Sequence, residues 1–151
     1  MRNESSNYQV AALPIRHRRG QVGVLLVTSR ETKRWVIPKG WPMDGRTDYN
    51  AAKIEAFEEA GAEGRIGTTA IGEFEYIKRL KDGTCKSCRV AVYPLNVSAL
   101  AFNWPEQNER ERRWFSVEDA AQMVREQQLR EIILALKLSS RRQQFCISTT
   151  I

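Results

Sequence analysis

Cysteine and histidine are both scarce in this 151-residue chain, and their scarcity excludes two classes of small protein. Three cysteines, an odd number, argue against a framework of disulfides. Cys85 and Cys88 form a C-x-x-C pair, but no second pair follows and His17 is the only histidine, so a closed zinc site lacks ligands. We interpret these cysteines as reduced thiols in a strand region.

Long hydrophobic runs are also missing. The best apolar run, VGVLLV at 22–27, has the length of a strand, whereas a bilayer-spanning helix needs roughly 18–20 apolar residues. The N-terminal MRNESSNYQV is polar and has no hydrophobic signal segment. We therefore expect a cytoplasmic location and no membrane partner.

The composition, 42% hydrophobic and 28% charged, is typical of a soluble globular protein. The length predicts a single domain over 1–151, with polar segments 1–7 and 139–151 as flexible tails. A net charge of +6 favours polyanionic partners such as nucleotides or polyphosphates. The basic residues are dispersed and are not interleaved with aromatic residues, so we do not expect nucleic acid as the partner. The oligomeric state stays open.

Hydrophobic patterns and turn residues predict a mixture of strands and helices. The predicted strands cover 8–15, 21–29, 34–38, 64–80, 85–98 and 112–116, and the KDG turn at 81–83 joins two of them as an antiparallel pair. The predicted helices cover 48–60, 117–124 and 127–138, the first beginning after Thr47 and ending at Gly61. Because strands and helices do not alternate strictly, this order predicts an α/β (α+β) fold with a mixed sheet between helices.

The first of these helices carries three glutamates, Glu55, Glu58 and Glu59. At about 100° per residue they lie within one arc of roughly 100°, bordered by alanines, while Ile54 and Phe57 are predicted to pack on the sheet. Three carboxylates on one face form a hard-oxygen site that suits Mg²⁺ or Mn²⁺. The alternative is a solvated acidic stripe.

The loop before the helix carries a resemblance to a known family. From Gly40 through IEAFEEAG at 54–61, the spacing resembles the box of the Nudix hydrolases without a gap. WVIPKG before the box and RRWFSVEDA at 112–120 also resemble this family, so the likeness covers roughly 8–138. It implies a Nudix-type α/β/α sandwich.

Two positions depart from the box. The chain has Arg46 where the family usually has glutamate, and Ile54 where it has arginine. In the family these two residues typically form a structural ion pair. Losing both partners together costs little, because an apolar contact can replace a buried ion pair.

The resemblance implies a metal-dependent hydrolase that cleaves a pyrophosphate bond. Glu55, Glu58 and Glu59, with the carbonyl of Gly40, would hold Mg²⁺ or Mn²⁺, and the same three glutamates are the catalytic candidates. A metal-bound water would attack phosphorus. Its proton would pass to one of these glutamates or to a carboxylate of a later loop, for which the candidates are Glu106, Glu109 and Glu111. His17, in a basic turn, is a weaker candidate base.

The substrate is predicted to be a small phosphorylated molecule. Lys39, Arg34, Lys78 and Arg79 are candidates for binding its phosphates, and Trp35, Trp41 or Trp104 would either stack on a base or pack in the structure. Within the family, the PKG and RRWFSVEDA segments look most like diphosphoinositol polyphosphate and diadenosine polyphosphate hydrolases. The alternatives are a domain that binds a nucleotide or polyphosphate without cleaving it, and an RNA-directed pyrophosphohydrolase.

Overall fold

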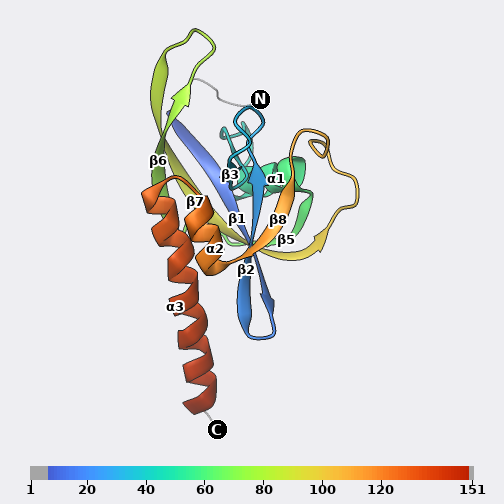
Figure 1. Cartoon of the computed structure of the whole chain (residues 1–151), viewed down its shortest axis with the longest axis vertical. Coiled ribbons are helices and arrows are strands. Elements are labelled where there is room, and N and C mark those ends of the chain that lie inside the picture. Colours follow the sequence, from blue (N-terminus) through green and yellow to red (C-terminus); the bar gives the residue numbers. More distant parts are fainter. Residues whose placement is uncertain (1–6, 150–151) are drawn as a thin grey trace.

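The computed structural model describes residues 7–149, with the side chains of residues 7–138, and shows a sheet covered by helices (Figure 1). The strands are β1 (Tyr8–Arg18), β2 (Gln21–Thr28), β3 (Trp35–Val36), β4 (Lys39–Gly40), β5 (Ala62–Ile66), β6 (Gly72–Arg79), β7 (Cys85–Leu100) and β8 (Arg112–Ser116). The helices are α1 (Asp48–Ala60), α2 (Val117–Met123) and α3 (Gln127–Thr149).

The sheet is mixed, as predicted. Its central order is β3-β2-β1-β7-β5, and β4, β6 and β8 pair with β1, β7 and β2 respectively. β1 runs parallel to β7, while every other strand pair in the described chain is antiparallel.

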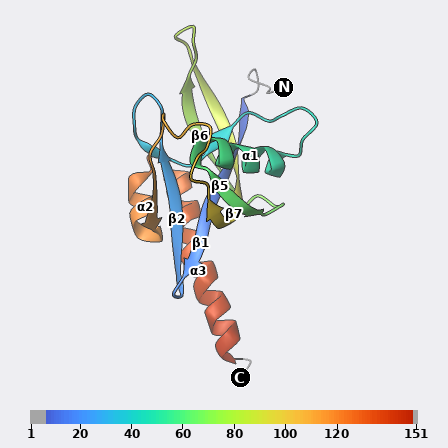
Figure 2. The same ribbon diagram turned by 90° about the vertical axis from the view of Figure 1, so that its right-hand side faces the viewer.

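Side chains along β1 point alternately to the two faces of the sheet, and each face is covered by a layer of helices. Val10 and Ala12 belong to a core with the alanines of α1, whereas Leu13 and Ile15 belong to a second core with residues of α2 and α3. Figure 2 shows α1 separated from α2 and α3 by the strands. The predicted α/β/α sandwich is therefore confirmed.

Helix α1 begins and ends as predicted. The Thr47 side chain accepts a hydrogen bond from the backbone N–H of Asn50, and Gly61 ends the helix with a left-handed φ of 62°. The buried face differs from the prediction, because Phe57 is 36% exposed. The face of α1 that is buried against the sheet consists instead of four alanines together with Glu55 and Glu59. Small alanine side chains let the helix approach the strands closely, which draws these two glutamates into the interior.

Two predicted boundaries are wrong. The segment 64–80 is not one strand, because β5 pairs with β7 from Leu95 onward and β6 pairs with it up to Val92. Pro94 lies between these two stretches and has no N–H to donate to a ladder. Helix α3 does not end at residue 138 but continues to Thr149. Residues 1–6 and 150–151 of the predicted tails lie outside the described residues.

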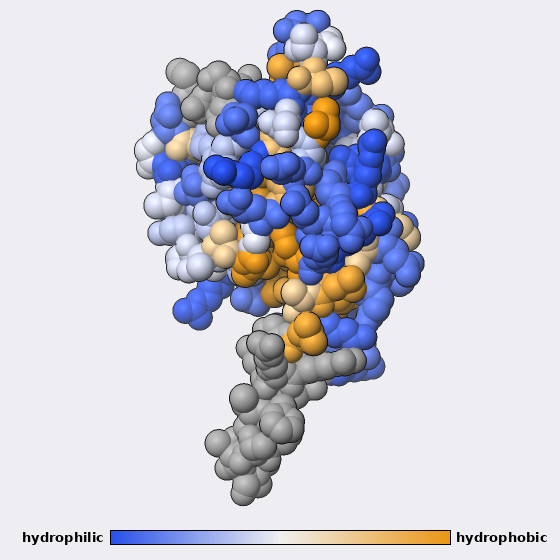
Figure 3. Space-filling view, turned by 90° about the vertical axis from the view of Figure 1, so that its left-hand side faces the viewer, coloured by the Kyte–Doolittle hydropathy of each residue, from blue (hydrophilic) through white to orange (hydrophobic). Residues whose placement is uncertain are grey.

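None of the helices in the described chain is both long and apolar enough to cross a bilayer. Figure 3 shows hydrophobic side chains reaching the surface on the side of the molecule where α3 lies. Leu134 and Leu138 of this helix are 46% and 59% exposed, while Leu129 and Ile133 are buried in the core. Only one face of α3 is therefore covered by the sheet.

Candidate active site

Glu55 and Gly40 form the closest contact between the loop and the helix of the box. Glu55 is only 2% exposed. A Cβ added at Gly40 would lie 2.4 Å from both Cδ and Oε1 of Glu55, which is closer than such atoms can approach. Glycine at this position therefore lets the backbone of β4 pack directly against a buried carboxylate.

The loop at 101–111 is docked on the C-terminal end of α1. The backbone N–H of Glu106 donates to the carbonyl of Glu58 at 3.0 Å. The indole of Trp104 donates to the carbonyl of Glu59 at 3.1 Å, and the guanidinium of Arg112 donates to the carbonyl of Ala60 at 2.9 Å. The last carbonyls of a helix have no partner within it, so this loop satisfies them. Residues 50 positions apart in the chain are brought together in this way.

Arg110 lies between the helix and the loop and is nearly buried, with 9% of its side chain exposed. Its Nε donates to Oε1 of Glu106 at 2.8 Å, its Nη2 is 3.8 Å from Oε2 of Glu59, and its Nη1 donates to the carbonyl of Thr28 at 3.1 Å. Arg110 was not among the predicted site residues. The i,i+4 spacing to Glu106 is a local signal for an ion pair, but nothing local indicates the contact with Glu59.

Of the three loop carboxylates predicted as a further ligand or base, only Glu106 is joined to Glu59 through this arginine. Glu109 is 3.9 Å from Arg30 and half exposed, and Glu111 is exposed. His17 is exposed near the end of the β1–β2 hairpin, six residues beyond Ala11, the β1 residue that pairs with Lys39.

Burial sets the electrostatics of Glu59, whose side chain is 8% exposed. Desolvation raises the pKa of Glu59 to about 6, against the opposing effect of Arg110 and Lys39. Burial also lowers the pKa of Lys39, and Glu59 opposes that shift. A side-chain hydrogen bond links the carboxyl groups of Glu59 and Glu55. Two carboxyl groups in hydrogen-bond contact are destabilised when both are ionised, and a bound cation would relieve this.

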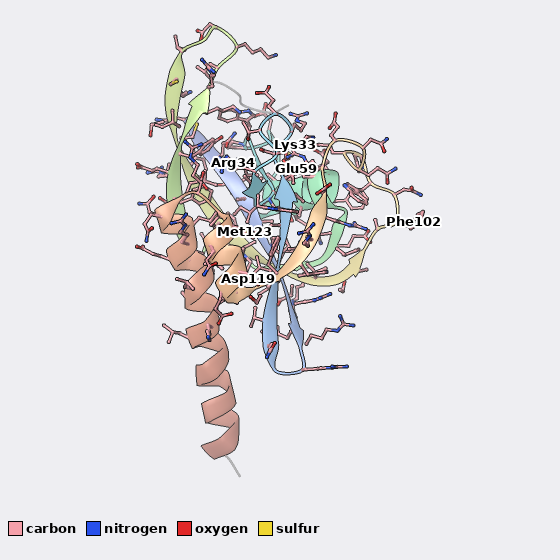
Figure 4. The ribbon with its side chains drawn as sticks, in the orientation of Figure 1. Lys33, Arg34, Glu59, Phe102, Asp119 and Met123 are labelled. Carbon is pink, nitrogen blue, oxygen red and sulfur yellow. The ribbon has the colours of Figure 1, made fainter. Side chains whose placement is uncertain are left out.

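Three of the four predicted phosphate-binding residues lie close to one another, and one of them, Lys39, is near Glu59. Arg34 and Lys78 both act on the charge of Lys39. The ammonium of Lys39 lies over the Tyr76 ring at 4.7 Å, that of Lys78 over the Trp41 ring at 5.6 Å, and Arg34 pairs with Glu126 at 3.1 Å. Figure 4 shows Arg34 and Glu59 toward the same end of the sheet, while Phe102 points away from it.

Arg79 does not join this group. Side chains alternate along β6, so Tyr76 and Lys78 share one face and Arg79 lies on the other, where it is exposed. The prediction of Arg79 as a substrate-binding residue has no support in this geometry.

The three predicted tryptophans have different surroundings. Trp41 is buried, and Trp104 is held by its hydrogen bond to Glu59 and by the Arg112 guanidinium 3.8 Å from its ring. Trp35 packs edge-on against Phe115 and also borders an open cavity of about 510 Å³, together with Lys33 and residues 107–111. Trp35 therefore borders a space that a ligand could enter.

The two departures from the box leave no buried charge without a partner. Arg46 is exposed and Ile54 is half-buried. An exposed arginine needs no ion pair, so the loss of the family's usual pair is consistent with this surface position.

The donor set fits a hard divalent cation in its chemistry. The candidate oxygen donors are the carboxylates of Glu55, Glu59 and Glu106, the half-buried carboxylate of Glu58 and the backbone of Gly40, and all of the carboxylate oxygens suit Mg²⁺ or Mn²⁺. Within the described residues, however, no three acidic, histidine or cysteine side chains are close enough to hold an ion as they stand. Glu59 and Glu106 both face the guanidinium of Arg110.

Comparisons with known proteins agree on one family. Residues 6–136 match the family model described as NUDIX domain. The chain is 34% identical over 105 residues to "Nudix hydrolase 12, mitochondrial" of Arabidopsis thaliana, covering 68% of this chain and 52% of that protein. It is 32% identical over 123 residues to "Diphosphoinositol polyphosphate phosphohydrolase 3-beta" of Homo sapiens, covering 80% and 71%. The chain thus spans about half the length of the plant relative.

The structure also resembles solved structures. A binary complex of the C. elegans Ap4A hydrolase superposes with a TM-score of 0.64 at 21% identity, covering 87% of this chain and 95% of that one. The NUDIX domain of Shewanella oneidensis NrtR, complexed with ADP ribose, has a TM-score of 0.61 at 16% identity, covering 91% and 87%. At such identities the likeness shows a shared fold.

Proposed function

The chain belongs to the Nudix family, and from this premise we propose that it is a divalent-metal-dependent hydrolase of a pyrophosphate bond in a small phosphorylated molecule. One observation carries the proposal. Glu55 and Glu59 of α1 are both buried, and Glu55 packs against a glycine that no other residue could replace without a clash. Buried carboxylates are costly for a purely structural helix, and they are explained by a cation that uses them.

Glu58 and Glu59, with the Gly40 carbonyl and Glu106, would hold Mg²⁺ or Mn²⁺. A bound divalent ion would neutralise the carboxylates and the phosphates and would lower the pKa of a water molecule. Glu55, the most buried of the three glutamates, is our candidate to accept the proton of the attacking water.

Lys39, Arg34 and Lys78 would bind and orient the phosphates. The Arg34 side chain is held by Glu126, and the ammonium groups of the two lysines lie over Tyr76 and Trp41, so their positions are set before a substrate arrives. Preset cations stabilise negative charge on a transferring phosphoryl group without reorganisation. Lys39 lies close enough to Glu59 to lower the pKa of that carboxyl group, and Arg34 and Lys78 lie near Lys39.

For the substrate, we propose a diphosphoinositol polyphosphate or a dinucleoside polyphosphate. The 32% identity to a protein named as a diphosphoinositol polyphosphate phosphohydrolase supports this, as do the net charge of +6 and the three cations beside the site. The cavity bordered by Trp35 offers space for the inositol ring or nucleoside to which the substrate's phosphates are attached.

The test is a turnover panel with Mg²⁺ and with Mn²⁺. The panel holds diphosphoinositol polyphosphates, dinucleoside polyphosphates, nucleotide sugars, NADH, dNTPs and 5′-triphosphorylated RNA, and the products of hydrolysis are separated and quantified by anion-exchange chromatography. Glu59→Gln should lower kcat/KM by at least about 100-fold, because it removes a buried anionic ligand. Glu63→Gln is the matched control, an exposed carboxylate of β5, and should stay within about twofold of the parent.

Other outcomes separate the alternatives. Binding of a panel member without hydrolysis of any of them would identify a non-catalytic binding domain. Preference for the RNA would identify the RNA-directed enzyme. Turnover that Glu59→Gln leaves unchanged would refute the assignment of the site.

A further inference from the structure

A second cavity, bordered by arginines, lies at the far end of the β1–β2 hairpin. It measures about 530 Å³ and is lined by residues 16, 18, 19 and 21–23 of the hairpin and 114–116 of β8. Figure 1 shows this hairpin projecting beyond the body of the molecule. Arg16 is six positions along β1 from Val10, the partner of Gly40. At the rise of a strand, the two residues are about 20 Å apart. The cavity is therefore separate from the proposed active site.

Three arginines, Arg16, Arg18 and Arg19, surround this cavity. None of them forms an ion pair with an acidic side chain in the part of the chain that the structure describes. Arg16 and Arg18 share one face of β1. Desolvation lowers the pKa of Arg16, and the positive charge of Arg18 lowers it further. Like charges gathered without a counter-ion favour binding of an anion.

Arg16 is held in place by its surroundings. Its guanidinium lies 4.1 Å from the centre of the Trp114 ring. Gly23, the cross-strand partner of Arg16, borders this stack, and a Cβ there would lie in van der Waals contact, 3.4 Å from Cγ and Nε of Arg16 and 3.5 Å from the indole. The stacked guanidinium keeps its N–H donors at the edge of the ring.

Arg19 occupies a turn position that ordinarily favours another residue. Its φ is 53°, and that of Gly20 is 76°. A two-residue hairpin turn of this kind prefers asparagine or glycine at both positions, because other side chains are strained there. An arginine in this place keeps a third positive charge at the cavity at the expense of local conformational energy.

We propose that this cavity is a second anion-binding site, for a compact ligand with adjacent phosphate groups. Arginine suits it because its guanidinium donates two parallel hydrogen bonds to a phosphate. A compact phosphate cluster fits better than a single-stranded nucleic acid, because bases bind by stacking on free aromatic rings and Arg16 already covers Trp114. The site is independent of the proposed catalytic activity.

The experiment is calorimetric titration with tripolyphosphate, without divalent metal, at low salt. Arg18→Gln combined with Arg19→Asn removes two charges, and asparagine suits the left-handed turn. The double variant should bind tripolyphosphate at least about tenfold more weakly than the parent, or with one site fewer. Lys53→Gln combined with Arg65→Gln removes the same charge from exposed positions of α1 and β5 and should bind like the parent.

Amide NMR shifts locate the bound probe. The proposal predicts shifts at residues 16–23 and 114–116 that persist in Lys78→Gln, a variant of the other basic cluster. Equal loss of affinity in both double variants would show a general charge effect and would overturn the proposal. Binding of single-stranded RNA at these residues without binding of tripolyphosphate would overturn it as well.

Discussion

A buried carboxylate without a cation is expensive, and Glu59 shows this cost at the scale of one residue. Its folded-state pKa of about 6 lies above the ordinary value of 4.5. The folded chain therefore binds more protons than the unfolded chain between these two pH values. It follows that the free energy of unfolding falls as the pH rises through this window, and the loss is complete above about pH 6.

Replacing Glu59 with glutamine should therefore stabilise the metal-free protein near neutral pH. The gain is at most about 2 kcal/mol at pH 7.5 and should vanish toward pH 4, where Glu59 is protonated in both states. Urea unfolding at pH 4, 5, 6 and 7.5 in EDTA measures it. Glu63→Gln, an exposed carboxylate of β5, provides the control and should leave the pH profile unchanged. A loss of stability at pH 7.5 in Glu59→Gln would mean that its contact with Arg110 outweighs desolvation.

At the scale of elements, local signals predicted α1 and could not predict its partner. Thr47 and Gly61 indicated both ends of the helix, because caps act within one turn. The docking of loop 101–111 on the end of α1 depends instead on three donors, Glu106 N–H, Trp104 and Arg112, which meet carbonyls about 45–52 positions away in the chain. Hydrophobic periodicity in the sequence cannot predict a contact between segments so far apart. The burial of alanines rather than Phe57 is likewise set by the close approach of the sheet.

The docked loop places Arg110 where a metal ion would compete with it. Removing this guanidinium in Arg110→Gln should tighten Mn²⁺ binding by about five- to tenfold, because Glu59 and Glu106 lose a positively charged partner. The metal-free variant should lose about 3–5 kcal/mol of stability, the usual cost of breaking a buried ion pair. Electron paramagnetic resonance of free Mn²⁺ measures the affinity. Arg65→Gln, an exposed arginine of β5, should change neither quantity. Weaker Mn²⁺ binding in Arg110→Gln would show that the guanidinium orients the carboxylates for the metal.

At the scale of the whole molecule, the mixed order of strands and helices was enough to predict a mixed sheet between helices. The distribution of charge was not. The basic residues looked dispersed and without aromatic interleaving along the sequence, yet strand pairing stacks Arg16 on Trp114 and the loop stacks Arg112 on Trp104. Contacts between residues about a hundred positions apart, such as Arg16 and Trp114, depend on the sheet order β1-β2-β8 and cannot be read from spacing.

Metal binding should stabilise the entire domain, because the proposed ligands come from β4, α1 and the loop at 101–111 and meet only in the folded state. A ligand at 100 times its Kd adds about 2.7 kcal/mol, which for a chain of this length corresponds to a rise in Tm of roughly 5–10 °C. Thermal unfolding with MnCl₂, compared with NaCl at equal ionic strength, separates this effect from screening. The combined variant Glu58→Gln and Glu59→Gln should lose the rise, and Glu63→Gln should keep it. An equal rise in Tm in the combined variant would place the ion elsewhere. The substitutions remove two of the proposed ligands, so an ion that they hold could no longer stabilise the folded state.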